Sequence, residues 1–342
     1  MTTNHAVGSP ARERLTWMDT FRGFAIILVI FGHVVSQPPL FGYEAPGWMQ
    51  DIRVLFAPYR MEGLMLLSGM LLPRALKKPL GPYYLGKVRN IAWPYFVWAA
   101  IFLMLVLRNP TWMDPASWIA TNWLWFIFFL FAYYAIAPAL ARVPNWLLAG
   151  AFWGGAVWLE LGAGVDFGTT GISILLAACY YGGFFFAGAF VFDSGLVWKL
   201  KHRATLVVTG VIAAAFLVYR YRIDWDVYND VLYVWGSIGT VLFVLGILQR
   251  LPARFAPPLQ SIGRSSLVYY ASHMPIIYLW MQLLAAVGID SVPAVFVGAF
   301  VLPVVLGALL AHFQKSPWVG WLFVMPLFSA RRGISVSSSQ VA

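Results

Sequence analysis

A carboxylate, a guanidinium and an imidazole lie within one stretch near the start of the chain, at Asp19, Arg22 and His33. Arg22 and His33 are eleven residues apart, which is about three helical turns, so a helix presents both on one face. They are separated by roughly 16 Å along the helix axis, at about 1.5 Å per residue. Because ionisable groups are costly inside a bilayer, these residues are candidates for a functional site.

A second group of polar residues is expected at the depth of His33. Arg60 and Glu62 follow each other closely in the next apolar segment, which runs back across the membrane. An imidazole beside a carboxylate is the arrangement of a general base that is held in one tautomer. The sequence therefore predicts that His33 acts as a base and that Glu62 orients it. In the alternative, Arg60 and Glu62 only neutralise each other.

A cationic cluster is expected at the level of Arg22. Lys87 and Arg89 begin the third apolar segment on the same side of the membrane. Three cations at the same membrane surface suit a phosphate-bearing ligand, since the planar guanidinium group of arginine can bond two phosphate oxygens at once. Contact with lipid headgroups is the competing interpretation, and for Arg22 a structural ion pair with Asp19 is another.

His273 is a further ionisable group within an apolar segment. Both a core histidine and a functional one stay open for it. No spacing of His, Cys, Asp and Glu predicts a metal site.

The elements that hold these residues are predicted to be transmembrane helices. Of the 342 residues, 61% are hydrophobic and 11% are charged, whereas soluble domains carry about 25% charged residues. We therefore expect an all-α, polytopic membrane bundle of about ten helices. The predicted spans are 17–36, 51–72, 88–107, 118–140, 146–161, 172–192, 204–219, 231–248, 265–287 and 292–312.

Charge placement predicts the orientation of this bundle. Although the net charge is +10, the cations lie in short loops between apolar segments, so we expect no nucleic-acid partner. Seventeen of the 23 basic residues fall on the side of both termini, which the positive-inside rule assigns to the cytoplasm. We expect one transmembrane domain over 16–330, with disordered cytoplasmic tails at 1–15 and 331–342, in the inner or plasma membrane.

The segment 14–33, in which ten residues separate an arginine from a histidine, resembles the opening of the acyltransferase-3 family of membrane proteins. Four later segments are also similar to that family: 59–69, which ends in Ser68-Gly69, 87–95, 124–134 and 263–273. One departure is that Lys87 and Arg89 stand two apart, where many members carry two arginines three apart.

The resemblance implies an enzyme that moves an acetyl or other short acyl group from cytoplasmic acyl-coenzyme A, foremost acetyl-coenzyme A, to a hydroxyl group of a carbohydrate or glycolipid. It implies that Arg22 and His33 are essential and that the donor is a substrate rather than a permanently bound cofactor. Arg22, Lys87 and Arg89 would hold the donor phosphates, and His33 with Glu62 would act in catalysis. Asp19, Arg60, Ser68 and His273 would form a substrate-binding or structural polar network.

Other functions remain open at this level. Intramembrane charges also mark the pathways of transporters and lipid or glycan flippases, although we find no inverted repeat in this chain. An amine acceptor in place of a hydroxyl, and a covalent acyl-histidine in place of direct transfer, are further alternatives.

Overall fold

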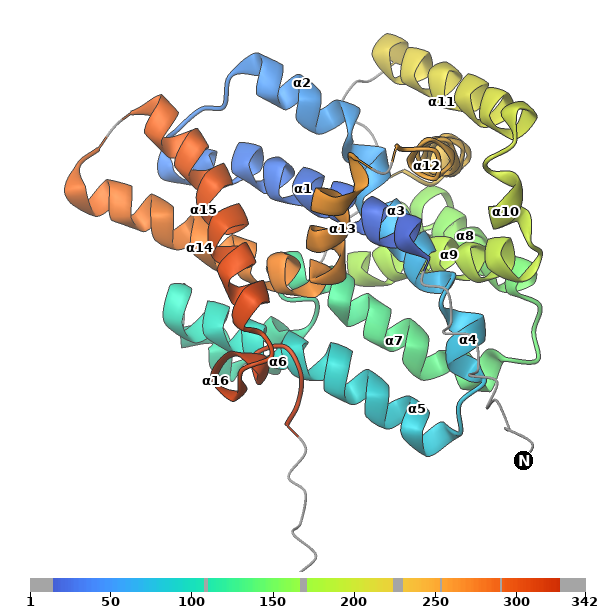
Figure 1. The fold of residues 1–342 in the computed structure, drawn as a ribbon, viewed down its shortest axis with the longest axis horizontal. Helices are drawn as coiled ribbons and strands as arrows, with labels where there is room; N and C mark the ends of the chain where they lie inside the picture. Colours follow the sequence, from blue (N-terminus) through green and yellow to red (C-terminus); the bar gives the residue numbers. More distant parts are fainter. Residues whose placement is uncertain are drawn as a thin grey trace, which may run out of the picture.

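The computed structural model describes residues 15–107, 110–166, 171–223, 230–252, 254–289 and 291–326. Within these ranges the chain forms helices and no strand, so the all-α prediction is confirmed. Figure 1 shows long helices packed against one another in one body. Apart from Leu15, the predicted tails lie outside the described residues.

Seven helical segments of the described chain are long and apolar enough to cross a bilayer, so the protein is a multi-pass membrane protein. These segments are Thr16–Phe41, Leu80–Val106, Asn122–Leu140, Ser173–Asp193, Arg203–Arg222, Val231–Leu248 and Val292–Phe313. The predicted count of about ten spans is therefore not confirmed.

The three other predicted spans are helical but interrupted or more polar. Residues 51–72 fold as α2 (Gly47–Leu55) and α3 (Ala57–Gly69), separated at Phe56. Pro58 lies in the first turn of α3, where its missing N–H leaves no helical bond unmade. Helix α8 (Asn145–Val157) continues into a π-helical turn, and α14 (Ser266–Val287) carries polar residues that include His273.

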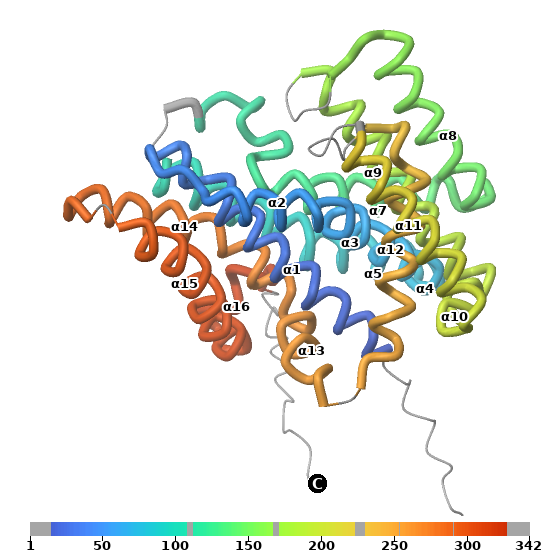
Figure 2. Tube along the Cα trace, turned by 90° about the horizontal axis from the view of Figure 1, so that it is seen from above, coloured from blue at the N-terminus to red at the C-terminus, as the bar shows by residue number. Residues whose placement is uncertain are grey.

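The polar residues singled out above are enclosed because α1 (Thr16–Ser36) lies at the centre of the bundle. Helices from several parts of the chain pack against it: α3, α12 (Val234–Leu248), α13 (Ala256–Arg264), α14 and α15 (Val292–Phe313). Helix α3 packs in turn against α9 (Ser173–Asp193). In Figure 2, α1 and α3 lie between the α14–α15 pair and the helices α9 to α12.

The remaining helices surround this centre: α4 (Leu72–Leu76), α5 (Leu80–Lys87), α6 (Trp93–Ala100), α7 (Trp125–Leu140), α10 (Leu196–Lys199), α11 (Arg203–Ile223) and α16 (Pro317–Gly320). Figure 1 shows α5 beside α7, and α11 at the edge of the bundle against α12. A π-helical turn, Val88–Ala92, joins α5 to α6.

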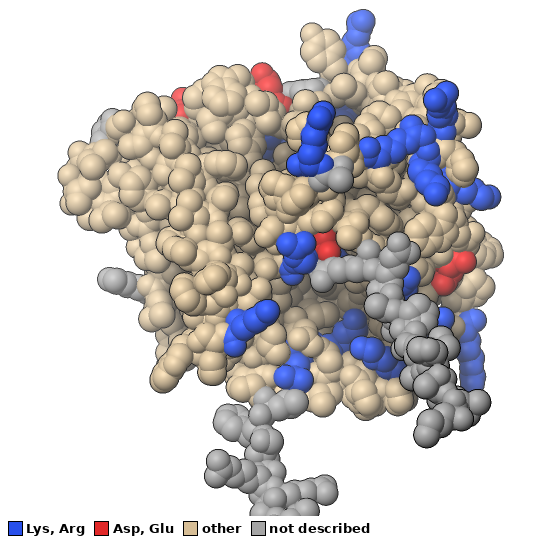
Figure 3. Space-filling model, in the orientation of Figure 1, with Lys and Arg blue, Asp and Glu red and all other residues tan. Residues whose placement is uncertain are grey.

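Charge is unevenly distributed over the surface. In the view of Figure 3, basic side chains gather over the right and lower parts, whereas the left part, formed by α14 and α15, is almost free of charge. A surface without charge is what lipid tails require, and cations suit the headgroup region.

Two glycines allow α3 and α9 to approach closely. A Cβ atom at Gly69 would overlap the carbonyl oxygen of Phe185, and one at Gly188 would overlap that of Leu66. Small residues at such contacts let membrane helices pack backbone to backbone. The pairing of α3 with α9, which fixes the helix that carries Glu62, therefore depends on these two positions.

We expect Gly188→Ala to destabilise the protein by about 1–3 kcal/mol, the range typical of overpacking, because the added methyl group meets backbone that cannot rotate away. The measurement is the thermal unfolding midpoint of the purified protein in detergent. Gly150→Ala in α8 is the matched control, since a Cβ atom there meets nothing within 4 Å and alanine favours a helix. Equal midpoints for the two variants would contradict this account of the packing.

Candidate functional site

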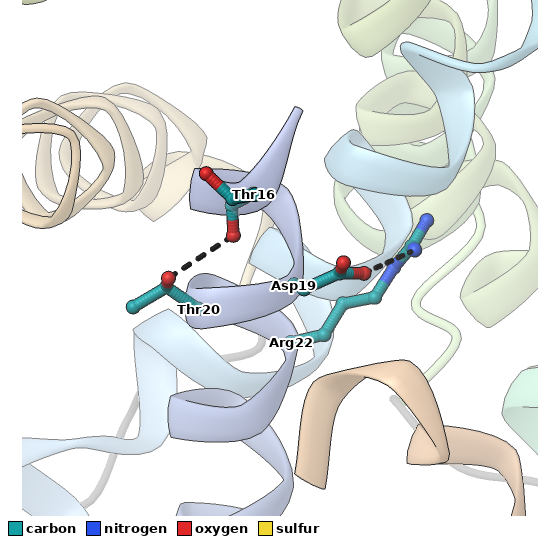
Figure 4. Close-up of polar contacts among 4 residues, drawn as sticks. All are labelled: Thr16, Asp19, Thr20 and Arg22. Carbon is teal, nitrogen blue, oxygen red and sulfur yellow. Dashed lines mark hydrogen bonds and ion pairs between the residues drawn. The ribbon is translucent and has the colours of Figure 1, made fainter. Parts of the chain in front are cut away.

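Asp19 and Arg22 lie one turn apart on α1 and form an ion pair. The distance between Arg22 Nη1 and Asp19 Oδ1 is 3.7 Å, with the Asp19 side chain 6% exposed and the Arg22 side chain 24% exposed. Figure 4 shows the Arg22 side chain extending away from the axis of α1, with its guanidinium group beside Asp19. The same view shows Thr20 Oγ1 bonded to the carbonyl oxygen of Thr16, at 3.1 Å.

Arg22 opens onto a cavity of about 420 Å³, which we call the Arg22 cavity. Its polar lining comes from Arg22, Ser68, Lys87, Asn90 and Ser266, while leucine, isoleucine and aromatic side chains form the rest of its wall. The Ser68 hydroxyl donates to the carbonyl oxygen of Leu64 at 2.7 Å. The cavity therefore combines two cations with an apolar wall.

Lys87 is held in this cavity by aromatic rings. Its Nζ atom lies 3.1 Å from the ring centroid of Tyr134 and 5.5 Å from that of Tyr83. The Tyr134 ring is fixed in turn, because its hydroxyl donates to the carbonyl oxygen of Ser68 at 2.8 Å. A cation–π contact keeps the ammonium charge in place without neutralising it.

Arg89 does not belong to the lining of the Arg22 cavity. Its Nε atom donates to the carbonyl oxygen of Met325 at 3.2 Å, and the amide of Met325 donates to the carbonyl oxygen of Arg89 at 3.1 Å. The structure thus brings Arg22 and Lys87 together as the sequence predicts, and it uses Arg89 to hold the segment after α16. Asn90, the next residue, lines the cavity in its place.

His33 lines a second cavity of about 180 Å³, which we call the His33 cavity. Arg60 and Glu62 also line it, so the structure brings these three predicted residues to one cavity. Gly32 makes room for the arginine, because a Cβ atom there would overlap Arg60 Nη1. The rest of the wall is largely aromatic and comes from three helices and the segment before α7: Trp123, Trp125, Tyr181 and Tyr270.

Glu62 is 1% exposed, and its hydrogen-bond partner in the structure is Tyr180. The hydroxyl of Tyr180 donates to Glu62 Oε1 at 3.4 Å, while Glu62 Oε2 is buried with no hydrogen-bond partner. The predicted role of Glu62 in orienting His33 stays a prediction.

The two cavities lie on either side of Tyr270, which lines both. Trp123 Nε1 donates to the carbonyl oxygen of Tyr270 at 3.0 Å, and the hydroxyl of Tyr270 donates to the carbonyl oxygen of Trp123. Ala120 and Asn122, just before Trp123, have positive φ angles of 50° and 41°, and such strained backbone persists where its surroundings fix it. The two hydrogen bonds between Trp123 and Tyr270 hold the boundary between the cavities.

His273 lies next to His33, at the level of the second cavity. The ring centroids of the two histidines are 5.1 Å apart, and His273 is fully buried. The Trp123 ring also lies near His273, at 6.3 Å between centroids. His33 and His273, which are 240 residues apart in the chain, thus form a pair in the centre of the bundle.

Sequence reasoning missed several residues of the site, namely Gly32, Asn90, Trp123, Tyr180, Tyr181 and Tyr270. Apolar segments rich in aromatic residues do not distinguish rings that face lipid from rings that line a cavity. The one available indication was the tyrosine pair in each of α9 and α14, since a phenolic hydroxyl inside a membrane needs a partner.

A family model described as an acyltransferase domain, Acyl_transf_3, matches residues 15–312. The matched range contains every candidate residue from Asp19 to His273. No curated protein and no solved structure matches the chain.

Proposed function

This chain belongs to the Acyl_transf_3 family of acyltransferases, and from that membership we propose that it moves an acetyl or other short acyl group from acyl-coenzyme A to a hydroxyl group of a cell-envelope glycan or related acceptor. The observation that carries the proposal is the pair of cavities on either side of Tyr270, one with two cations and the other with an imidazole.

The Arg22 cavity suits the donor. Arg22 and Lys87 provide positive charge for the phosphate groups of coenzyme A, and charge-assisted hydrogen bonds to phosphate are strong. The apolar wall beyond them suits the pantetheine arm, with the thioester at the Tyr270 end. The Arg22 side chain is 24% exposed and lines this cavity, so its guanidinium group lies where it can contact a ligand.

The His33 cavity suits the acceptor and the chemistry. Aromatic faces and two charged side chains line it, which is a surface that can stack against a sugar ring and bond its hydroxyl groups. His33 contributes the imidazole of this cavity, and an imidazole is the side chain that most often serves as a general base.

In the proposed reaction, the acceptor oxygen forms a bond to the thioester carbonyl carbon while the carbon–sulfur bond breaks. His33 takes the proton of the acceptor hydroxyl and returns it to the departing thiolate of coenzyme A. The free thiol and the acylated acceptor are the products. A two-step route, in which His33 itself carries the acyl group, uses the same residues.

We propose that both termini lie in the cytoplasm and that the membrane is the inner or plasma membrane. The basic residues on the side of the termini support this orientation. Donor and acceptor then enter from opposite faces, which accounts for a base between them.

The test uses the purified protein in lipid nanodiscs with acetyl-coenzyme A and an extract of envelope glycans. We expect release of free thiol together with acetyl groups on the glycan fraction, measured by mass spectrometry. A burst of thiol release without acceptor would favour the two-step route. Acetyl groups found on amines alone would contradict the hydroxyl acceptor. If neither thiol release nor acetylation occurs, the proposed donor is contradicted as well.

A further inference from the structure

His273 lies against His33, but it has no role in the reaction proposed above. The two rings lie 5.1 Å apart between centroids and are tilted by 37°. The structure has no hydrogen bond between the two rings, but rings this close need only a change of side-chain torsion to bring two nitrogens within hydrogen-bond distance. His33 lines the cavity, whereas His273 lies behind it and is fully buried.

Hydrogen bonds fix the tautomer of His273. Its Nδ1 atom lies 2.8 Å from the carbonyl oxygen of Tyr270 and 3.2 Å from that of Tyr269. Carbonyl oxygens only accept, so Nδ1 carries the hydrogen and Nε2 presents a lone pair. The same Tyr270 carbonyl accepts from Trp123 Nε1, which ties this tautomer to the boundary between the cavities.

Two complementary atoms are then left on adjacent rings. His273 Nε2 and His33 Nδ1 are both buried, and neither has a hydrogen-bond partner in the described structure. Buried polar groups of proteins are nearly always bonded, and an exception calls for an explanation. An acceptor on one ring and a potential donor on the other are natural partners.

We propose that His273 is a positioning residue that accepts a hydrogen bond from His33 Nδ1–H at its Nε2 atom. The bond leaves Nε2 of His33 unprotonated toward the cavity, where it can take the acceptor proton. After that step His33 carries hydrogen on both nitrogens, and the lone pair of His273 stabilises the imidazolium. This inference rests on the acyl transfer proposed above. It gives the imidazole of His273 the role of orienting His33 that the sequence predicted for Glu62.

The test compares two isosteric replacements of His273. In His273→Asn the amide nitrogen can still donate to the Tyr270 carbonyl, but no acceptor reaches the position of Nε2. In His273→Gln the longer side chain offers its carbonyl oxygen at that position. We expect Asn to lower kcat about 10- to 100-fold, the loss typical of partners that orient a metal-bound histidine, with KM for acetyl-coenzyme A unchanged. Gln should recover most of kcat.

Each other outcome contradicts the proposal. An active Asn variant beside an inactive Gln variant would show that His273 only bonds the helix carbonyl. Equal loss in both variants, or full activity in both, would also overturn the positioning role. Should the wild type itself transfer no acyl group, the proposed function fails instead, and the two failures are thereby distinguished.

A second measurement needs no variant and is independent of folding defects. NMR of the wild type with isotope-labelled histidine reports which ring nitrogen carries hydrogen in each of the five histidines. We expect one buried residue with a protonated Nδ1 and a hydrogen-bonded, unprotonated Nε2. A protonated Nε2 at His273 would overturn the inference.

Discussion

Replacing His33 with alanine is expected to lower acyl transfer by about 10²–10⁴-fold, the usual cost of losing a general base. His33 is the imidazole that lines the cavity beyond Tyr270, and without it the acceptor hydroxyl keeps its proton while it attacks the thioester. The loss should fall on kcat, because the donor phosphates are held in the other cavity. Thiol release and acylated product, measured on the purified protein, provide the readout.

The control for this variant is His202→Ala. His202 is exposed beside the start of α11 and lines neither cavity, so its loss should leave transfer unchanged. Both variants should have the unfolding midpoint of the wild type, because His33 borders a cavity rather than close-packed core. A His33→Ala protein with wild-type turnover would remove His33 from the mechanism.

Replacing Arg22 with alanine is expected to lower kcat/KM for acetyl-coenzyme A by about 10–100-fold. A hydrogen bond to a charged group contributes about 1.5–3 kcal/mol, and each 1.4 kcal/mol corresponds to a factor of ten. The effect should appear mainly in KM, since Arg22 lies in the Arg22 cavity and away from His33. Arg22→Lys should recover only part of the affinity, because an ammonium group lacks the planar fork of a guanidinium.

Two comparisons separate donor binding from a structural role of the Asp19–Arg22 pair. Asp19→Asn breaks the ion pair and keeps the cation, so it should leave KM for the donor unchanged or lower it. If the pair is only structural, Asp19→Asn should be as harmful as Arg22→Ala. Lys315→Ala, which removes an exposed cation outside the cavity, controls for the general loss of positive charge.

The first helix illustrates how much of the site the sequence predicts. A span over 17–36 was expected, and α1 extends over Thr16–Ser36. Helical periodicity relates Arg22 to His33 because the backbone geometry of a helix is local and regular. In the structure each of them lines a cavity, and the two cavities share Tyr270.

The second predicted span shows where local pattern is insufficient. Its apolar content predicted one helix, whereas the chain forms α2 and α3 with a break at Phe56. Hydropathy averages over a window and does not register one residue with non-helical dihedral angles. The break determines how α3 enters the bundle, and with it the setting of Arg60 and Glu62.

By itself, the sequence determined the helical membrane class and the first helix. It also grouped Arg22 with Lys87, and His33 with Arg60 and Glu62, because ionisable residues are rare in membrane helices and each one can be identified from the sequence. Only the tertiary structure decided the partners: Met325 for Arg89, Tyr180 for Glu62 and His273 for His33. These pairs join residues far apart in the chain. They depend on which helices approach closely, and that is set by shape and small residues at each crossing rather than by periodicity.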